Sequence, residues 1–321
     1  MPMLSVIVPL YNNQPEIGRA LNSIFTQTIQ DFEIIVVDGH STDGGLDVVK
    51  SIQDPRIHFF LQKGAGVSTA RNQGVERAQA DFIAFLDADD EWLPTHLEIL
   101  LHLREKFPEG GAYSTAYSVT GSDGSVQYKN YRFIPSHPWE GAIADYFRVV
   151  SYGANPVWTS VAAIPKEIFI ANGGFPTDAW WGEDEDLWGR IALKHPIIFS
   201  TEFSCIRHRA NVSEETRRNR ILKTKQHPFI KTAKRVMSTG SELQNRDLKN
   251  YVDFLEITNA LNFLGVGDKL SSRSILKKIN KFSLNWRNFE FYIYVDFCSL
   301  IPTFLYHSVA IPIYRRFFRG E

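Results

Sequence analysis

The chain has 321 residues, of which 44% are hydrophobic and 22% charged, a balance that suits a globular protein and excludes disordered and fibrous classes. Its two cysteines, Cys205 and Cys298, lie far apart and form no CxxC pair, which argues against a disulfide framework or a zinc site. No secretory signal pattern precedes the first apolar run, so the sequence favours a cytoplasmic protein.

The net charge of −1 hides two parts of opposite sign. Residues 1–220 carry 19 Lys and Arg against 28 Asp and Glu, a net charge of −9. Residues 221–321 carry 16 against 8, a net charge of +8. This asymmetry predicts two domains with these boundaries and with different partners. The basic part could meet a membrane surface, but it has no nucleic-acid recognition motif, so no nucleic-acid partner is expected.

Strands and helices alternate through the N-terminal part of the chain. Continuous apolar runs rich in Val and Ile predict strands buried on both faces, and apolar residues at helical spacing predict helices between them. Such alternation favours a parallel α/β sheet, in which ligands bind beyond the carboxyl ends of the strands. The predicted strands are residues 4–10, 32–37, 57–61 and 82–86, and the predicted helices begin near residues 15, 45 and 69.

The last of these strands ends in three carboxylates, Asp87, Asp89 and Asp90. Crowded carboxylates repel each other unless a cation lies between them, and oxygen ligands suit a hard divalent ion. The alternative is a solvated acidic turn in which Asp90 caps a helix that starts at Glu91. Asp38 ends a second strand and should lie at the same edge of the sheet, which favours a functional site.

A second acidic cluster lies in the middle of the chain. Residues 183–186 are four consecutive acids that follow two tryptophans at the start of an apolar helix. The helix dipole explains one or two acids there, whereas a sugar site combines an aromatic platform with a carboxylate base. The elements predicted before this cluster are a strand pair at 113–131, a helix at 139–150, a strand at 157–164 and a short helix from residue 165.

Four segments occur in a characteristic order and spacing: Ser5–Asn12, Val36–Gly44, Ala70–Asn72 and Phe85–Asp90. Together they resemble the family 2 glycosyltransferases over roughly the first two-thirds of the chain. The resemblance implies a GT-A-like nucleotide-binding sandwich, an α/β fold with a mostly parallel central sheet, followed here by a C-terminal helical extension. It also implies an inverting transferase that takes a sugar from a nucleotide-sugar donor, usually UDP-linked, with Mn or Mg as cofactor.

The resemblance assigns donor contacts to the first motifs. It implies that Asp38 lies at the base or ribose, that Arg71 lies near the nucleotide, and that Asp87 supports the metal or binds the ribose. For Arg71 the alternative is a surface salt bridge. Many relatives have a second Asp where this chain has Gly39, which leaves the identity of the base open. The other implied donor-binding residues are Pro9, Tyr11 and Ala88.

The metal, base and acceptor roles follow from the same resemblance. Asp89 is the implied main metal carboxylate, and His208 completes the metal or diphosphate site. Asp184 is the implied catalytic base, with Glu183 as the other candidate. Two other functions stay open, a non-catalytic nucleotide- or sugar-binding protein on the same fold and a nucleotidyltransferase. The expected acceptor-binding residues are Trp180 and Trp181.

The basic C-terminal part predicts helices and a region of membrane contact. Residues 251–264 have the spacing of an amphipathic helix, and residues 297–314 contain no Asp, Glu, Lys or Arg. The second stretch fits a buried helical pair, an interfacial membrane anchor or a membrane span. Acceptors of such enzymes are often glycans or lipid-linked. Peripheral contact with the inner face of the plasma membrane through the C-terminal part is therefore one expectation.

Overall fold

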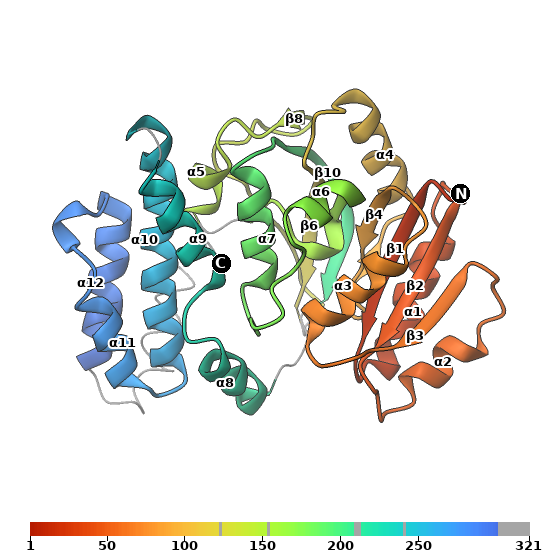
Figure 1. The fold of residues 1–321 in the computed structure, drawn as a ribbon, viewed down its shortest axis with the longest axis horizontal. Coiled ribbons are helices and arrows are strands. Elements are labelled where there is room, and N and C mark those ends of the chain that lie inside the picture. Colours follow the sequence, from red (N-terminus) through yellow and green to blue (C-terminus); the bar gives the residue numbers. More distant parts are fainter. Residues whose placement is uncertain (122–123, 153–154, 209–212, 240–241, 301–321) are drawn as a thin grey trace. The chain divides into compact units, whose positions relative to one another are not determined.

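A computed structural model describes residues 1–121, 124–152, 155–208, 213–239 and 242–300 (Figure 1). The chain divides into two compact units. The first consists of Met1–Ala144, Pro156–Thr177 and Glu183–Asn211, and the second of Asp145–Asn155, Asp178–Gly182 and Val212–Glu321. The domain boundary after residue 220 stays a prediction.

The N-terminal half of the first unit is a parallel α/β sheet. β1 lies between β2 and β4, and β3 pairs with β2, all in parallel (Figure 1). The runs of Val, Ile and Phe in β1, β2 and β4 are wholly buried, as expected of strands covered on both faces. The bounds are β1 (Leu4–Leu10), β2 (Phe32–Asp38), β3 (Ile57–Leu61) and β4 (Phe82–Phe85), with helices α1 (Gln14–Phe25), α2 (Gly45–Ser51) and α3 (Val67–Arg77).

The sheet continues in the order β3-β2-β1-β4-β9-β6-β10-β5. β9 runs antiparallel to both β4 and β6, whereas β6 and β10 are parallel. β7 pairs antiparallel with β6, which confirms the predicted strand pair. The end of β10 pairs with β5, directly after the acidic strand end. The bounds are β5 (Glu91–Trp92), β6 (Ala112–Thr120), β7 (Val126–Tyr128), β8 (Glu140–Ala142), β9 (Ala162–Pro165) and β10 (Ile197–His208), with helices α4 (His96–Lys106), α6 (Lys166–Ala171) and α7 (Glu183–Ala192).

Two elements predicted for the middle of the chain differ from the structure. Residues 139–150 form β8 and then helix α5 (Tyr146–Val150) instead of one helix. β8 pairs with β10, so contact with a distant strand overrides the local helical spacing. The strand predicted at 157–164 begins only at Ala162, because Thr159–Val161 form the 3₁₀ turn η1.

Helix α3 lies very close to β1, and this contact fixes the position of Arg71. A Cβ on Gly74 would lie only 2.5 Å from Cγ2 of Ile7. A larger residue would push the helix away from the strand, so glycine is required at this position. Ala70 and Val75 on the same helix are also buried. The tight packing gives the Arg71 side chain a rigid base.

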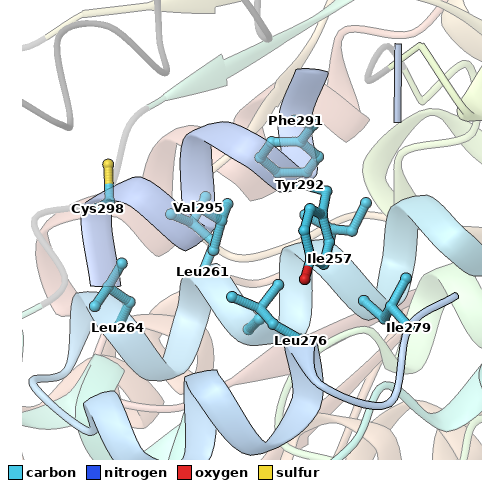
Figure 2. Close-up of a cluster of buried hydrophobic side chains, with 10 residues drawn as sticks. Ile257, Leu261, Leu264, Leu276, Ile279, Phe291, Tyr292, Val295 and Cys298 are labelled. Atoms are coloured by element: carbon cyan, nitrogen blue, oxygen red, sulfur yellow. The ribbon is translucent and has the colours of Figure 1, made fainter. Parts of the chain in front are cut away.

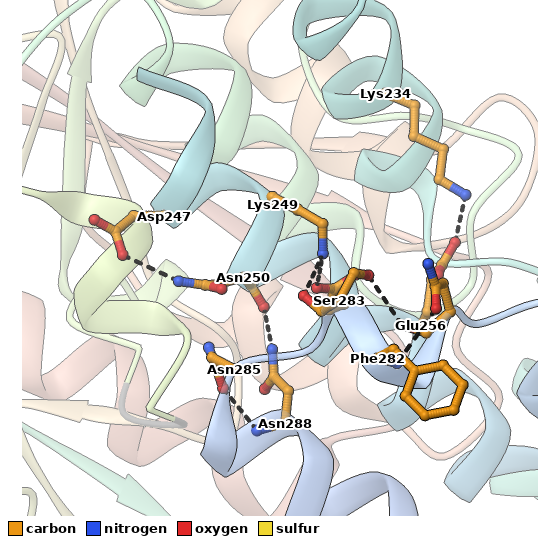
Figure 3. Close-up of polar contacts among 11 residues, drawn as sticks. Lys234, Asp247, Lys249, Asn250, Glu256, Phe282, Ser283, Asn285 and Asn288 are labelled. Carbon is orange, nitrogen blue, oxygen red and sulfur yellow. Dashed lines mark hydrogen bonds and ion pairs between the residues drawn. The ribbon is translucent and has the colours of Figure 1, made fainter. Parts of the chain in front are cut away.

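The second unit is helical. Its longest helix, α10, packs with α11 and α12 around a cluster of buried apolar side chains that includes Leu261, Phe291 and Val295 (Figure 2). Polar contacts also join these helices, since Nδ2 of Asn288 donates to the carbonyl of Asn250 at 2.7 Å (Figure 3). The helix predicted at 251–264 is confirmed within α10. The bounds are α8 (Glu214–Lys223), α9 (Pro228–Met237), α10 (Glu242–Gly265), α11 (Lys269–Leu276), the 3₁₀ turn η2 (Lys281–Ser283) and α12 (Trp286–Leu300).

Among the described residues, no helix combines the length and the apolar character that crossing a bilayer requires. Leu300 is the last described residue of helix α12, and residues 301–321 lie outside the described residues. The uncharged stretch 297–314 therefore falls mostly outside them, and its three interpretations stay open.

Candidate active site

Asp38, the predicted base or ribose contact, ends β2 and is fully buried. Its carboxylate accepts hydrogen bonds from the backbone N–H of His40 (3.1 Å) and from the N–H and Oγ of Ser41 (3.2 and 2.6 Å). These bonds shape the loop that follows the strand, because they hold two successive residues against its end. Asp38 therefore has a structural task in this loop, and its contact with a nucleotide stays a prediction.

The same loop is crowded at residue 39. A Cβ on Gly39 would lie 3.0 Å from Oε1 of Gln62 and 3.3 Å from Cδ2 of Tyr11. A second Asp, as in many relatives, would therefore require Gln62 or Tyr11 to shift. Of the other implied donor-binding residues, Pro9 and Ala88 are buried, whereas Tyr11 is 63% exposed.

Arg71 joins two acidic motifs that lie far apart in the sequence. Its guanidinium lies 2.6 Å from Oδ1 of Asp87 and 3.3 Å from Oε1 of Glu183, and its side chain is 5% exposed. Burial alone lowers the pKa of Arg71, but the charges of Asp87 and Glu183 raise it above its ordinary value. The guanidinium therefore stays charged. The alternative of a surface salt bridge is wrong, because this ion pair is buried.

The loop between α6 and α7 fixes both sides of this bridge. Asn72 on α3 exchanges two hydrogen bonds with the backbone of Phe175, at 2.8 and 2.9 Å. Arg190 on α7 donates to the carbonyl of Gly174 (2.6 Å) and pairs with Asp186 (2.8 Å). Both helices are thus anchored to one loop, which keeps the first turn of α7 beside α3.

Asp89, the predicted metal carboxylate, is held through its backbone. Its carbonyl oxygen accepts a hydrogen bond from Arg19 at 2.7 Å. The Asp89 carboxylate receives no hydrogen bond from any other residue that the structure describes. Burial, and then the charge of Asp87, raises the pKa of Asp89. A half-buried carboxylate that receives no hydrogen bond from another described residue is suited to take a cation.

Asp90 is a buried link between three segments, and its alternative role as a helix cap is wrong. The residues that follow it form β5, and α4 begins only after that strand. Its Oδ2 accepts hydrogen bonds from Oγ of Ser160 (2.6 Å) and Nε1 of Trp158 (3.0 Å). Its Oδ1 accepts one from the backbone N–H of His208 (3.2 Å). Burial, with two neighbouring carboxylates, raises the pKa of Asp90 to about 7.

His208 ends β10 and lies beside the acidic strand end. Its Nε2 lies 3.1 Å from Oε2 of Glu91, while its backbone is bound to Asp90. The preceding residue, Arg207, stacks its guanidinium 3.8 Å from the ring centroid of Trp158. The structure therefore places His208 beside Glu91 and Asp90, and Arg207 on the ring of Trp158. Ligation by His208 itself stays a prediction.

Asp184 lies in the first turn of α7, next to the Arg71 bridge. Its Oδ1 accepts from the N–H of Glu185 (2.8 Å), and its Oδ2 lies 3.5 Å from Oγ1 of Thr159. Burial, followed by the charges of Glu183 and Glu185, raises the pKa of Asp184 to about 8. Such a carboxylate is a stronger base than an ordinary aspartate. Glu183 is paired with Arg71, so Asp184 is the less engaged of the two candidate bases.

Trp180 and Trp181, the predicted acceptor contacts, belong to the second unit. The backbone N–H of Trp180 donates to Oγ1 of Thr224 (2.7 Å), and Nε1 of Trp181 donates to the carbonyl of the same residue (3.0 Å). Lys223 lies 3.9 Å from the ring centroid of Trp180. Both tryptophans thus have partners within their own unit, and their acceptor role stays a prediction.

The donor set at the acidic strand end suits a hard divalent cation. Asp87 and Asp89 offer carboxylate oxygens and His208 an imidazole nitrogen. The raised pKa of Asp89 reflects crowded negative charge that a cation would offset. Across the ranges that the structure describes, no three His, Cys, Asp or Glu side chains converge as a ready ligand group. Mg commonly takes one or two carboxylates and completes its ligand shell with phosphate oxygens and water.

Comparison with known sequences places these motifs in one family. The sequence profile of glycosyl transferase family 2 matches residues 5–173. A putative teichuronic acid biosynthesis glycosyltransferase, TuaG of Bacillus subtilis, is 38% identical over 39% of this chain and 50% of its own length. The GalNAc(5)-diNAcBac-PP-undecaprenol beta-1,3-glucosyltransferase of Campylobacter jejuni is 38% identical over 39% of this chain and 41% of its own length. The chain thus spans half or less of the length of these two relatives.

Comparison with solved structures confirms the fold. S. aureus TarS 1–349, in complex with UDP-GlcNAc, superposes with a TM-score of 0.56 at 16% identity, over 95% of this chain and 91% of that one. The mannosyltransferase PcManGT of Pyrobaculum calidifontis, in complex with GDP-Man and Mn²⁺, gives 0.60 at 20% identity, over 93% and 86%. The GT-A-like α/β fold, with its mostly parallel sheet and C-terminal helices, is therefore confirmed. With the profile match over residues 5–173, these findings establish that the chain belongs to glycosyl transferase family 2.

Proposed function

We propose that this chain is an inverting glycosyltransferase that moves a sugar from a nucleotide-sugar donor, with UDP as the nucleotide, to an acceptor hydroxyl. Residues 1–220 carry the catalytic machinery in this proposal. The observation that carries it is the buried Arg71 bridge, which ties Asp87 at the acidic strand end to Glu183 beside Asp184. Arg71 thereby links the acidic strand end, which is assigned to the leaving diphosphate, with the first turn of α7, which carries the proposed base Asp184.

The reaction assigns a separate task to each carboxylate. Asp184 in its ionised form accepts the proton of the acceptor hydroxyl, and its raised pKa suits this task because it makes the carboxylate a stronger proton acceptor than an ordinary aspartate. The acceptor oxygen then forms a bond to the anomeric carbon from the face opposite the phosphate. The bond between that carbon and the phosphate oxygen breaks, and the nucleoside diphosphate leaves.

The donor half of the site binds the nucleotide diphosphate. Asp38 and Arg71 hold the nucleotide end, and Asp89 with His208 would hold a Mn or Mg ion. That ion would offset the negative charge that develops on the leaving diphosphate. Arg207 supports the same charge from β10, where its guanidinium is already ordered on the ring of Trp158.

The acceptor in this proposal is a glycan, and a lipid-linked one is favoured. One relative is described as a glucosyltransferase acting with an undecaprenol-linked glycan. A lipid-linked acceptor requires the enzyme to reach a membrane surface. We therefore include peripheral contact of the C-terminal part with the inner face of the plasma membrane, where the net charge of +8 over residues 221–321 favours anionic lipid.

Two substitutions test the proposed tasks with a panel of sugar nucleotides. Asp184→Asn should retain the thermal shift that the donor and Mn produce, and should lower nucleoside diphosphate release by 10²-fold or more. Asp89→Ala should instead lose the Mn-dependent thermal shift. Asp81→Asn is the control, because Asp81 is exposed and precedes the buried strand β4.

Each outcome points to one function. Full diphosphate release by Asp184→Asn would remove Asp184 from the role of base. Pyrophosphate release by the wild-type chain would indicate a nucleotidyltransferase. A donor that shifts the melting temperature with no product of either kind would indicate a nucleotide- or sugar-binding protein.

A further inference from the structure

Helix α12 carries large apolar side chains around most of its circumference. A surface helix normally has one apolar face and one polar face. In α12 the inner face is buried with α10 and α11, through Phe291, Val295 and Cys298 (Figure 2). This face accounts for the packing of the helix in its unit, so the apolar residues elsewhere on the helix need another explanation.

The outer face of α12 consists of Trp286, Phe289, Ile293, Phe297 and Leu300, which follow the helical spacing of three and four residues. Trp286 is 74% exposed, Ile293 47%, Phe297 57% and Leu300 65%. The rings of Trp286 and Phe289 stack with centroids 6.2 Å apart. An open groove runs along this face. Glu290 also lines the groove, so one acid interrupts the apolar face. A cluster of exposed apolar side chains of this size still marks an interaction surface.

Basic side chains gather just before the outer face. Lys277, Lys278 and Lys281 are exposed, and Phe282 beside them is 88% exposed. Other cations of the unit are used internally, since Lys234 pairs with Glu256 and Lys249 with Asp253 (Figure 3). Within the described residues, no ion pair joins the three exposed lysines to an acid. They are therefore available to an anionic partner.

We propose that the outer face of α12, with Phe282 and the three lysines, is the surface that rests on an anionic lipid bilayer. Exposed Trp and Phe with adjacent lysines are the combination that binds at the headgroup level of a membrane. The sequence that follows has the same combination of apolar and basic residues, because residues 297–314 have no charged side chain and residues 315–319 contain three arginines. The inference specifies the membrane contact of the proposed function, but it does not depend on sugar transfer.

Two other occupants are possible outcomes of the test, a second copy of the chain and residues 301–321. Both would cover apolar surface equally well. Neither accounts for the three lysines, because a second copy would bring the same positive charges together and residues 315–319 are basic. Charge complementarity therefore favours an anionic bilayer.

Vesicle flotation with the full chain tests the surface. Wild type should float with vesicles of phosphatidylcholine and phosphatidylglycerol and bind at least tenfold more weakly to phosphatidylcholine alone. Trp286→Ser with Ile293→Ser should weaken binding to the anionic vesicles at least tenfold, because two apolar side chains that the bilayer would bury are lost. Lys277→Gln with Lys278→Gln should weaken it roughly fivefold per lysine. The matched control is Ile170→Ser on α6, since Ile170 is 64% exposed and belongs to the first unit.

The same samples keep this inference separate from the catalytic proposal. Donor binding, measured as the Mn-dependent thermal shift, should be unchanged in the α12 and lysine variants. Anionic-vesicle binding that is unchanged by Trp286→Ser with Ile293→Ser would overturn the proposal and assign membrane contact to residues 301–321. A change from dimer to monomer in light scattering, without a change in flotation, would overturn it in favour of contact between copies.

Discussion

The first unit buries charge, whereas the second unit exposes apolar surface. In the first unit, Arg71 is 4% exposed and Asp90 is 2% exposed. In the second, Trp286 and Phe282 are 74% and 88% exposed. Both arrangements depart from the usual distribution of residues between interior and surface. Both cost stability, and a fold keeps such departures where another molecule is to be bound.

The buried charges of the first unit and the exposed apolar face of the second differ in how many partners fix their side chains. Arg71 and Asp90 are fixed by several partners each, from different strands and helices. The outer face of α12 lies on one helix and has no comparable set of partners among the described residues. Substitutions in the first unit should therefore change both stability and activity, whereas those on α12 should change only binding.

The largest effect is expected from removing the guanidinium of Arg71. Arg71→Met leaves Asp87 and Glu183 as partly buried carboxylates without their counter-charge, which should lower the free energy of unfolding by about 3 kcal/mol. Diphosphate release should also fall by 10²-fold or more, because the link between the two acidic motifs is lost. Urea unfolding followed by circular dichroism, with donor turnover on the same samples, measures both quantities.

Arg77→Met provides the control for this substitution. Arg77 lies on the same helix and packs 4.6 Å from the ring centroid of Phe60, but no salt bridge joins it to an acid within the described residues. Its replacement should cost less than 1 kcal/mol. Equal losses in the two variants would contradict the bridge as the organising contact of the site.

The Arg71 bridge also shows which part of the site the sequence alone predicts and which part it does not. The strands that end at Asp38 and before Asp87 follow from local apolar runs, and the first turn of α7 follows from its acids and apolar spacing. The link through Arg71 does not follow, because its second partner, Glu183, lies 112 residues away. Local patterns specify elements, whereas the tertiary fold decides which side chains pair.

Asp90 illustrates the same limit. A helix cap is what local pattern predicts for an acid at this position. The actual donors, on Trp158, Ser160 and His208, lie 68, 70 and 118 residues away. Strand β5 replaces the predicted helix because Glu91 and Trp92 pair with β10. Only the order of strands in the sheet brings these segments together.

A smaller effect is expected from Asp90→Asn. An amide oxygen can replace one carboxylate oxygen, but the amide nitrogen cannot accept from Ser160, Trp158 or His208. Leaving one or two buried donors unsatisfied should lower the free energy of unfolding by about 1–3 kcal/mol. Where the unsatisfied donor is the backbone N–H of His208, weaker binding of Mn should accompany the loss, because Asp90 no longer holds that residue.

Urea unfolding and Mn titration by calorimetry measure the two consequences. Asp81→Asn is the matched control, since Asp81 is exposed. If Asp90→Asn unfolds at the wild-type urea concentration and binds Mn equally well, then Asp90 is not the link between β10 and the acidic strand end.

The smallest effect concerns the pH dependence of stability at Asp184. Its pKa is about 8 in the folded chain and lies near 4 in an unfolded one, so the folded state holds the proton to higher pH. The stability that this group contributes is therefore complete below about pH 4 and is lost as the pH rises through about 8. The amide of Asp184→Asn cannot ionise, so this variant does not lose stability at residue 184 as the pH rises. Because the carboxylate is only half-buried, we expect a gain of about 1 kcal/mol at pH 8, or roughly 2–4 °C in Tm.

Differential scanning fluorimetry from pH 5 to 9 measures this gain, with Asp178→Asn as the control because Asp178 is exposed. The difference in Tm between Asp184→Asn and wild type should increase up to about pH 8 and then level off. A variant less stable than wild type at every pH would mean that the hydrogen bonds of Asp184 outweigh the burial of its charge. A difference in Tm that does not change with pH would mean that the pKa of Asp184 is not raised in the folded chain.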